Sequence, residues 1–203
     1  MDIILVIFFS YLSGSIPFGL LLTKFFTNQD VRKIGSGNIG ATNVLRTGNK
    51  ILATATLILD AVKGYIPVIT VQHFFPELLQ ISALFAFLGH VFPIWLKFQG
   101  GKGVATYLGI LFAFSNALGV LFIFTWVVLA LIFKYSSVSS IFSSLTVLIV
   151  TLLRENAVKA IDPNFTFLFN FQLILFVFFI LIVFTHRKNI YNLKNRVEQK
   201  IKL

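Results

Sequence analysis

The sequence contains no cysteine, and only seven of its 203 residues are aspartate or glutamate. The absence of cysteine excludes disulfides, thiolate catalysis and zinc or iron–sulfur sites ligated by thiolates. The scarcity of acidic residues argues against magnesium-dependent head-group transferases, which need several aspartates on adjacent helical turns. The sequence also lacks an H-E-x-x-H motif and a carboxylate cluster, so we expect neither a metal site nor a cofactor.

Charged residues of either sign are also scarce. They make up 12% of the chain, whereas an ordinary soluble domain carries about 25%. In their place stand long apolar runs with 25 phenylalanines, and the mean hydropathy is +0.90. This composition predicts an integral membrane protein, with residues 1–203 forming a single transmembrane domain. The apolar N-terminal run follows no basic segment and ends at no clear cleavage site, so we expect a retained first span.

The apolar runs predict an all-α, polytopic fold with seven transmembrane helices. A full span needs about 20 residues. The runs lie near residues 3–25, 51–71, 80–96, 104–115, 117–133, 138–153 and 165–184. The stretch 104–133 is long for one span and short for two. We therefore expect a tight turn at Ser115 and Asn116, and a fourth span that is short or begins inside the preceding glycine-rich loop.

The distribution of basic residues favours seven spans and sets their orientation. With the 27–50 loop in the cytoplasm, only Arg154 and Lys159 of the 17 lysines and arginines lie outside, and Lys63 lies within a span. A single helix in place of the fourth and fifth spans would move the basic tail outside, against the positive-inside rule. We therefore predict an external N-terminus and a cytoplasmic C-terminus.

The net charge of +10 does not by itself indicate a nucleic-acid partner. The basic residues follow membrane sidedness, and the basic tail 187–202 suits solvent or anionic lipid head groups. We therefore expect contact with membrane lipid and no nucleic-acid binding.

Two glycine-rich segments interrupt the apolar runs. The first reads GSGNIGATNVLR over residues 35–46, and the second reads GGKG over residues 100–103. Loose polar backbone is too costly in hydrocarbon, so both segments must lie at the membrane face or line a polar cavity. Glycines let successive N–H groups converge, and convergent N–H groups beside lysine or arginine bind anions. We predict that both segments bind phosphate.

The residues of these two segments suit that role. Arg46 offers a planar guanidinium for phosphate, and Lys102 opens a predicted helix whose dipole favours an anion. The second segment is not a P-loop, because Gly103 stands where that motif needs Ser or Thr. The predicted binding residues are Gly35, Gly37, Asn38, Gly40, Thr42, Asn43, Arg46, Gly100, Gly101, Lys102 and Gly103, with Ser36 beside them.

Other polar residues allow more than one interpretation. Asp60 and Lys63 lie in the second span at i, i+3, where they either form a structural ion pair or contribute to a polar cleft. His90 either satisfies a local carbonyl, which we favour, or orients the second glycine segment. Seven spans place both segments, the serines after Lys134 and His186 on the cytoplasmic face. We predict that these elements meet at one cleft.

Several motifs together resemble one family, the bacterial membrane acyltransferases that move an acyl chain from acyl phosphate to glycerol 3-phosphate. They are SGSIPFG (13–19), GSGNIGATNVLR (35–46), LDAVKGYIP (59–67), GHVFPIWLKFQGGKGVAT (89–106) and HRKNI (186–190). The resemblance covers nearly the whole chain in the family's order. It implies seven helices, a cytoplasmic active site, lysophosphatidic acid as product and no metal or acyl-carrier-protein requirement.

The resemblance also implies roles for individual residues. The family's phosphate and substrate contacts match Ser36, Asn38, Arg46, Lys102, Ser140, His186 and Asn189. Among these, Ser36, His186 and Asn189 are expected in catalysis and Ser140 in substrate binding. The chain departs from the family in having Lys188 where Glu is frequent, and in its Lys- and Asn-rich tail.

The expected reaction suits this set of residues. An acyl phosphate is already activated, so no covalent Ser or Cys intermediate is required. The site must hold two anions, align the 1-hydroxyl with the acyl carbonyl and stabilise the oxyanion, as Arg46, Lys102 and the glycine-segment amides can do. The base is either His186 or the leaving phosphate, with His186 and Asn189 then acting as positioners.

We therefore expect a glycerol-3-phosphate acyltransferase of the bacterial cytoplasmic membrane, a monomer functionally linked to the enzyme that supplies acyl phosphate. The alternative is a membrane transporter of an organic phosphate, which would use the same cationic, glycine-rich cleft. Polar residues concentrate on the cytoplasmic half of the predicted spans, which favours the enzyme, and we see no internal repeat of the kind that transporters use.

Overall fold

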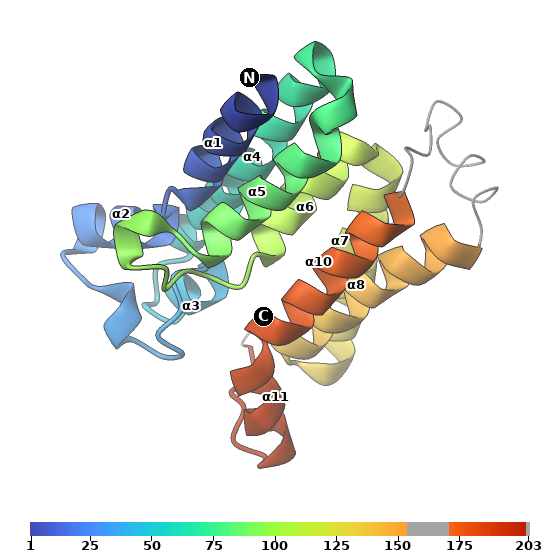
Figure 1. Ribbon diagram of the computed structural model, residues 1–203. Helices are drawn as coiled ribbons and strands as arrows, with labels where there is room; N and C mark the ends of the chain where they lie inside the picture. The colour runs from blue at the N-terminus through green and yellow to red at the C-terminus, as the bar shows by residue number, and fades with distance from the viewer. Residues whose placement is uncertain (154–170, 202–203) are drawn as a thin grey trace. The chain divides into compact units, whose positions relative to one another are not determined.

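The computed structural model describes residues 1–153 and 171–201, and the regular elements in these residues are all helices (Figure 1). The chain forms two compact units, Met1–Ala113 and Phe114–Leu203. The prediction of a single domain over residues 1–203 stays a prediction.

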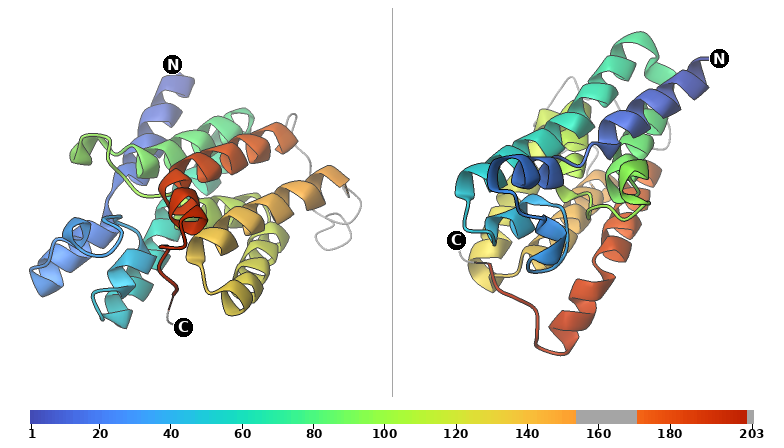
Figure 2. Two further views of the ribbon diagram at one scale, coloured as in Figure 1. Left: turned by 90° about the horizontal axis from the view of Figure 1, so that it is seen from below. Right: turned by 90° about the vertical axis from the view of Figure 1, so that its left-hand side faces the viewer.

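The first unit contains long membrane helices and short helices between them. They are α1 (Asp2–Ser15), α2 (Phe18–Thr27), a 3-10 helix (Val31–Lys33), α3 (Ala41–Leu45), α4 (Lys50–Phe74), a 3-10 helix (Pro76–Leu78), α5 (Leu79–Val91), a 3-10 helix (Ile94–Leu96) and α6 (Val104–Phe114), of which the last residue, Phe114, belongs to the second unit. α1, α4 and α5 lie side by side in Figures 1 and 2.

Glycines allow these helices to approach one another closely. A Cβ atom at Gly14 of α1 would overlap the backbone of Ala86 in α5, and one at Gly89 of α5 would overlap the backbone of α1. Gly64 of α4 and Gly109 of α6 make the same kind of contact between those two helices. Small residues at helix crossings are typical of membrane proteins, where close van der Waals packing replaces the hydrophobic effect between helices. This close packing holds in place the helices that flank the two glycine-rich segments.

The first predicted span, 3–25, is broken into two helices. Pro17 lacks an N–H group, and Ile16 before it has the extended backbone that proline favours (φ −63°, ψ 118°). α1 therefore ends at Ser15, and α2 begins at Phe18.

The second unit contains α7 (Asn116–Phe133), α8 (Ser136–Leu153), α10 (Phe171–Thr185) and α11 (Arg187–Lys194). α8 packs against both α7 and α10. The predicted turn at Ser115 and Asn116 is confirmed: Ser115 is extended, and its hydroxyl accepts a hydrogen bond from Ala117 N at the start of α7. Ser115 thus separates a short α6 from a full-length α7, as the sequence predicted.

Five helical stretches within residues 1–153 are long and apolar enough to cross a membrane. They are Asp2–Thr27, Lys50–Phe74, Pro76–Leu96, Asn116–Phe133 and Ser136–Leu153. The pair α10 and α11, bent by 55°, makes a sixth if it is counted as one span, and α6 has only 11 residues. The helical membrane architecture is confirmed, whereas seven spans and their sidedness stay predictions. The start of the predicted 165–184 span, Arg154 and Lys159 lie outside the described residues.

Candidate active site

The first glycine-rich segment is folded around the side chain of Asn43. This side chain is buried, and its Nδ2 lies within hydrogen-bond distance of the carbonyl oxygens of Val31 (2.8 Å), Ile34 (2.9 Å) and Asn38 (2.7 Å). Its Oδ1 accepts from Ser36 N at 2.9 Å. An amide side chain has two donor protons and two acceptor lone pairs. The Asn43 amide is therefore occupied in shaping the segment.

Arg46 lies beside this amide. Its Nη1 is 3.4 Å from Asn43 Oδ1, and the side chain is half-buried at the end of α3. Gly35 has a left-handed backbone (φ +53°), and a Cβ atom there would collide with Asn43 Oδ1 and lie 2.7 Å from Arg46 Cδ. Glycine at position 35 thus makes room for both side chains. By contrast, Arg32 is exposed, and its Nε and Nη2 donate hydrogen bonds to the carboxylate of Asp30. These hydrogen bonds lower the pKa of Asp30 to about 2.

The backbone amides of this segment mostly bond within it. Gly37 N donates to Ile34 O, Gly40 N donates to Asn38 Oδ1, and Ser36 N donates to Asn43. This differs from our prediction that convergent glycine amides face a phosphate. The physical reason is that a loop with few regular backbone bonds must satisfy its own N–H groups. Thr42 lies on α3, which begins after Gly40.

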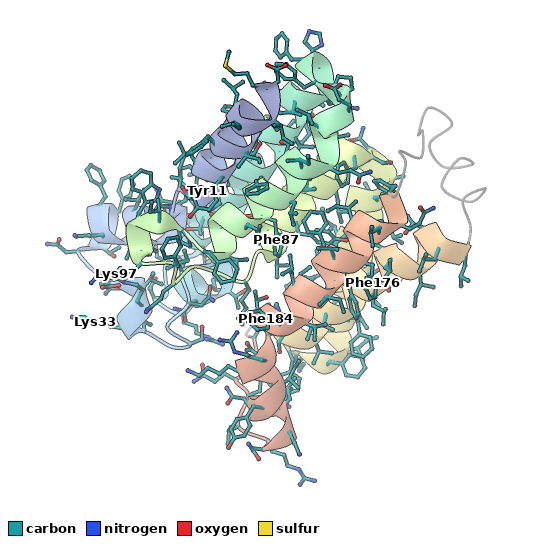
Figure 3. The ribbon with its side chains drawn as sticks, in the orientation of Figure 1. Tyr11, Lys33, Phe87, Lys97, Phe176 and Phe184 are labelled. Atoms are coloured by element: carbon teal, nitrogen blue, oxygen red, sulfur yellow. The ribbon has the colours of Figure 1, made fainter. Side chains whose placement is uncertain are left out.

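The second glycine-rich segment folds back onto the end of α5. Gly100 N donates to Val91 O (3.1 Å), and Gly101 N donates to His90 O (3.0 Å). These two amides therefore hold the segment in place, again in contrast to the predicted anion contact. The preceding turn has left-handed backbone at Lys97 (φ +53°), which is labelled in Figure 3, and at Phe98 (φ +62°).

Lys102 follows these glycines and is half-buried two residues before the start of α6. Gly103 has φ +81°, and a Cβ atom there would overlap the ring of Phe87 on α5, also labelled in Figure 3. Leu96, four residues before the second segment, packs against a buried cluster to which Ile39 and Val44 of the first segment belong. That cluster consists of Leu20, Val31, Ile39, Val44, Leu52 and Ala53.

The ion pair between Asp60 and Lys63 is present and buried. Lys63 Nζ lies 2.7 Å from Asp60 Oδ1 and donates to Ile16 O at 2.6 Å, where α1 ends. Asp60 Oδ1 is also 3.8 Å from His90 Nδ1. The His90 ring lies against Gly101, because a Cβ atom at Gly101 would overlap Nε2. Our preferred interpretation, that His90 satisfies a local carbonyl, is wrong for Nδ1, which has no hydrogen-bond partner among the described residues.

His186 occupies the bend between α10 and α11 in the second unit. It is 2% exposed, and its Nδ1 lies 2.8 Å from Ile182 O. A carbonyl oxygen only accepts, so Nδ1 carries the proton, and in the neutral ring Nε2 is the basic nitrogen. Asn189 follows at i+3, on the same side of the chain as it enters α11, and is also buried.

Glu198 accepts a hydrogen bond from Asn189, a contact that was not predicted from the sequence. Its Oε1 accepts from Asn189 Nδ2 at 2.6 Å and from Ser137 Oγ at 3.2 Å, and its Oε2 accepts from Asn192 Nδ2 at 3.3 Å. Ile201 N donates to Lys134 O, so this part of the tail returns to the start of α8. The tail was predicted to be solvated or lipid-bound. The available signal was that Glu198 is an isolated acid in a basic tail.

The Ser140 hydroxyl connects two helices of the second unit. It donates to Ser136 O at 2.8 Å and accepts from Trp126 Nε1 of α7 at 3.1 Å. The second unit thus brings Ser137, Asn189 and Glu198 together, while the first brings Ser36, Asn43 and Arg46 together. That all four polar elements meet at one cleft stays a prediction.

Comparison with known proteins agrees with these observations. The sequence model of the family described as glycerol-3-phosphate acyltransferase matches residues 4–196. The chain is 51% identical to a glycerol-3-phosphate acyltransferase of Pelagibacter ubique, with 100% of both chains covered. It is 49% identical to one of Mesorhizobium japonicum, with 98% of this chain and 96% of the relative covered.

The fold is similar to crystal structures of PlsY (YgiH), an integral membrane glycerol 3-phosphate acyltransferase. The glycerol 3-phosphate form matches with a TM-score of 0.88 and 31% identity, covering 100% of this chain and 96% of that one. The lysophosphatidic acid form matches with a TM-score of 0.86 and 30% identity over the same shares. Sequence and structure therefore agree that the chain belongs to the glycerol-3-phosphate acyltransferase family, whose members are integral membrane enzymes.

Proposed function

We propose that this enzyme transfers an acyl group from acyl phosphate to the 1-hydroxyl of glycerol 3-phosphate, releasing lysophosphatidic acid and phosphate. The observation that carries the proposal is the full-length likeness to a membrane acyltransferase crystallised with glycerol 3-phosphate and with lysophosphatidic acid. Those two ligands are one substrate and the product of this reaction. The transporter alternative receives no support from this likeness.

The reaction forms one bond and breaks one. The glycerol hydroxyl oxygen attacks the acyl carbonyl carbon, the new ester C–O bond forms, and the C–O bond to phosphate breaks. Phosphate departs with the bonding electrons, and the hydroxyl proton passes either to phosphate or to His186. Because the donor is a mixed anhydride, the protein needs chiefly to position both anions and stabilise the oxyanion.

The basic side chains on the glycine-rich segments suit this task. Arg46 lies beside a fully engaged Asn43 and has a planar guanidinium for phosphate; Lys102 is held on a segment bonded to the end of α5. We assign these two to phosphate binding, with Ser36 and Asn38 beside Arg46. His186, Asn189 and Ser140 complete the site in our proposal. The glycines and Asn43 then act by shaping the segments that present these groups.

The setting that we propose follows from the charge distribution. Seven spans, with an external N-terminus and a cytoplasmic C-terminus, would put the site at the inner face of the bacterial cytoplasmic membrane. We propose a monomer that receives acyl phosphate from a separate enzyme. The lysophosphatidic acid would serve as the first intermediate of phospholipid synthesis.

A direct assay tests the proposal. Purified protein in lipid is given palmitoyl phosphate and labelled glycerol 3-phosphate without added metal. We expect lysophosphatidic acid and phosphate in equal amounts, and loss of both with Lys102→Ala. Lys97→Asn is the matched control, since it removes a nearby exposed cation and asparagine tolerates left-handed backbone. No product, but uptake of glycerol 3-phosphate into sealed vesicles, would favour the transporter.

A further inference from the structure

The imidazole of His90 lies against the segment that carries Lys102. Gly101 lies directly against the ring, because a Cβ atom there would overlap Nε2 and approach Cε1 and Cδ2 within 3 Å. Gly101 N also donates to the carbonyl of His90 itself. His90 therefore contacts Gly101, the residue before Lys102, through both its backbone carbonyl and its ring.

His90 is in turn connected to the interior of the first unit. It is 3% exposed, and its Nδ1 faces Asp60 Oδ1 at 3.8 Å. Asp60 pairs with Lys63 at 2.7 Å, and Lys63 Nζ bonds to Ile16 O at the break between α1 and α2. Polar side chains thus follow one another from the α1–α2 break through α4 and α5 to the second glycine segment, although the step from Asp60 to His90 is longer than a hydrogen bond.

A structural ion pair alone does not explain this arrangement. Two opposite charges at i, i+3 on one helix can neutralise each other without a third polar residue. His90 nevertheless places a titratable ring in the apolar interior, where polar groups are costly unless they serve a purpose. Its Nδ1 makes no hydrogen bond among the described residues and has the Asp60 carboxylate as its charged neighbour. The ring thus faces Asp60 on one side and meets Gly101 on the other.

We propose that Asp60 and His90 are positioning residues that fix the 100–103 segment and thereby the ammonium group of Lys102. This inference rests on the proposed function, because it takes Lys102 to bind a substrate phosphate. Neither residue touches the reacting atoms. A small displacement of the segment would move the Lys102 charge away from its anion, and misplacement of a binding group by about 1 Å can cost about 100-fold in rate.

The test compares two variants with Lys102→Ala. His90→Asn keeps a polar group facing Asp60 but removes the far edge of the ring beneath Gly101. Asp60→Asn with Lys63→Gln removes both charges together, so that neither is left buried and alone. The Lys102→Ala variant first identifies the substrate whose KM depends on the lysine. We expect both variants to raise the KM of that same substrate about tenfold or more, with a smaller change in kcat.

A structural readout accompanies the kinetics. Hydrogen–deuterium exchange of residues 97–104 should be faster in both variants, while exchange in the middle of α4 and α5 stays as in the parent. Ser82→Ala is the control: it removes another buried polar contact of α5, the 2.8 Å bond to Ser10, and should change neither KM nor segment exchange.

Every outcome of these measurements either supports or overturns the proposed positioning role. Normal KM and normal segment exchange in the variants would overturn the proposal and leave Asp60 and Lys63 as a structural pair. If His90→Asn fails to fold, the charge-neutral double variant gives the answer by itself. If the parent protein shows no acyltransferase activity, the proposed function fails, whereas unchanged exchange overturns the support of the segment independently of activity.

Discussion

The side-chain amide of Asn189 donates a 2.6 Å hydrogen bond to the carboxylate of Glu198, which also accepts from Ser137. One acid therefore holds a proposed active-site residue of α11 and a residue of α8 at the same point. We expect Glu198→Ala to lower kcat/KM about tenfold, because it leaves the Asn189 amide without this acceptor. Kinetics of purified protein check this. The neighbouring exposed Gln199→Ala is the control, and equal activity in the two variants would contradict the prediction.

Loss of either proposed phosphate-binding cation should severely impair catalysis. Arg46→Ala and Lys102→Ala should each lower kcat/KM at least about 100-fold, because removing one partner leaves a phosphate charge uncompensated, at a cost of roughly 2–5 kcal/mol. Exposed Lys33→Ala serves as the control, since it removes a cation near the first segment outside the proposed site. Near-normal kinetics for both site variants would remove the assignment of an anion site.

His186→Ala should lower kcat more than it changes KM, because the proposed role of the imidazole lies in the transition state. Steady-state kinetics with each substrate varied in turn measure this. His186→Gln then separates the two open mechanisms. Glutamine can donate or accept a hydrogen bond but cannot take the proton, so its activity stays high only if phosphate is the base. A change in KM alone in His186→Ala would make the residue a binding residue.

Gly35→Ala should abolish most activity, whereas Gly48→Ala should not. Both glycines have left-handed backbone, so both substitutions carry the strain of about 1–2 kcal/mol expected for a Cβ atom there. Only Gly35 also faces Asn43 Oδ1 and Arg46, while a Cβ atom at Gly48 meets nothing within 4 Å. Activity and Tm of both variants test the difference. Equal activity losses would show that backbone strain alone matters.

Tags on the two termini should report opposite sides of the membrane. Seven spans and the distribution of basic residues require this result. Protease accessibility in intact spheroplasts and inverted vesicles measures it. Both tags on one side would refute the seven-span proposal and place His186 across the membrane from the glycine-rich segments.

Much of the fold could be predicted because the signals are local. Apolar runs report membrane helices directly, since only helices and closed barrels satisfy the backbone in lipid. The turn at Ser115 could also be predicted from the sequence. A serine hydroxyl can cap a helix by accepting a hydrogen bond from a backbone N–H group in the first turn, which lies only a few residues away in the chain. The break at Pro17 was missed, although the local signal was present: proline disfavours helical backbone at Ile16.

The sequence by itself determined that this chain is a helical membrane protein, and its ordered motifs already indicated an acyltransferase with cationic, glycine-rich segments. Only the tertiary structure decided which polar groups meet other polar groups of the protein. These are the Asn43 amide, the glycine N–H groups, Asp60 facing His90, and Glu198 bonded to Asn189. Composition and spacing depend on neighbours along the chain. Hydrogen-bond partners depend on which distant segments the packed helices bring within about 3 Å of each other.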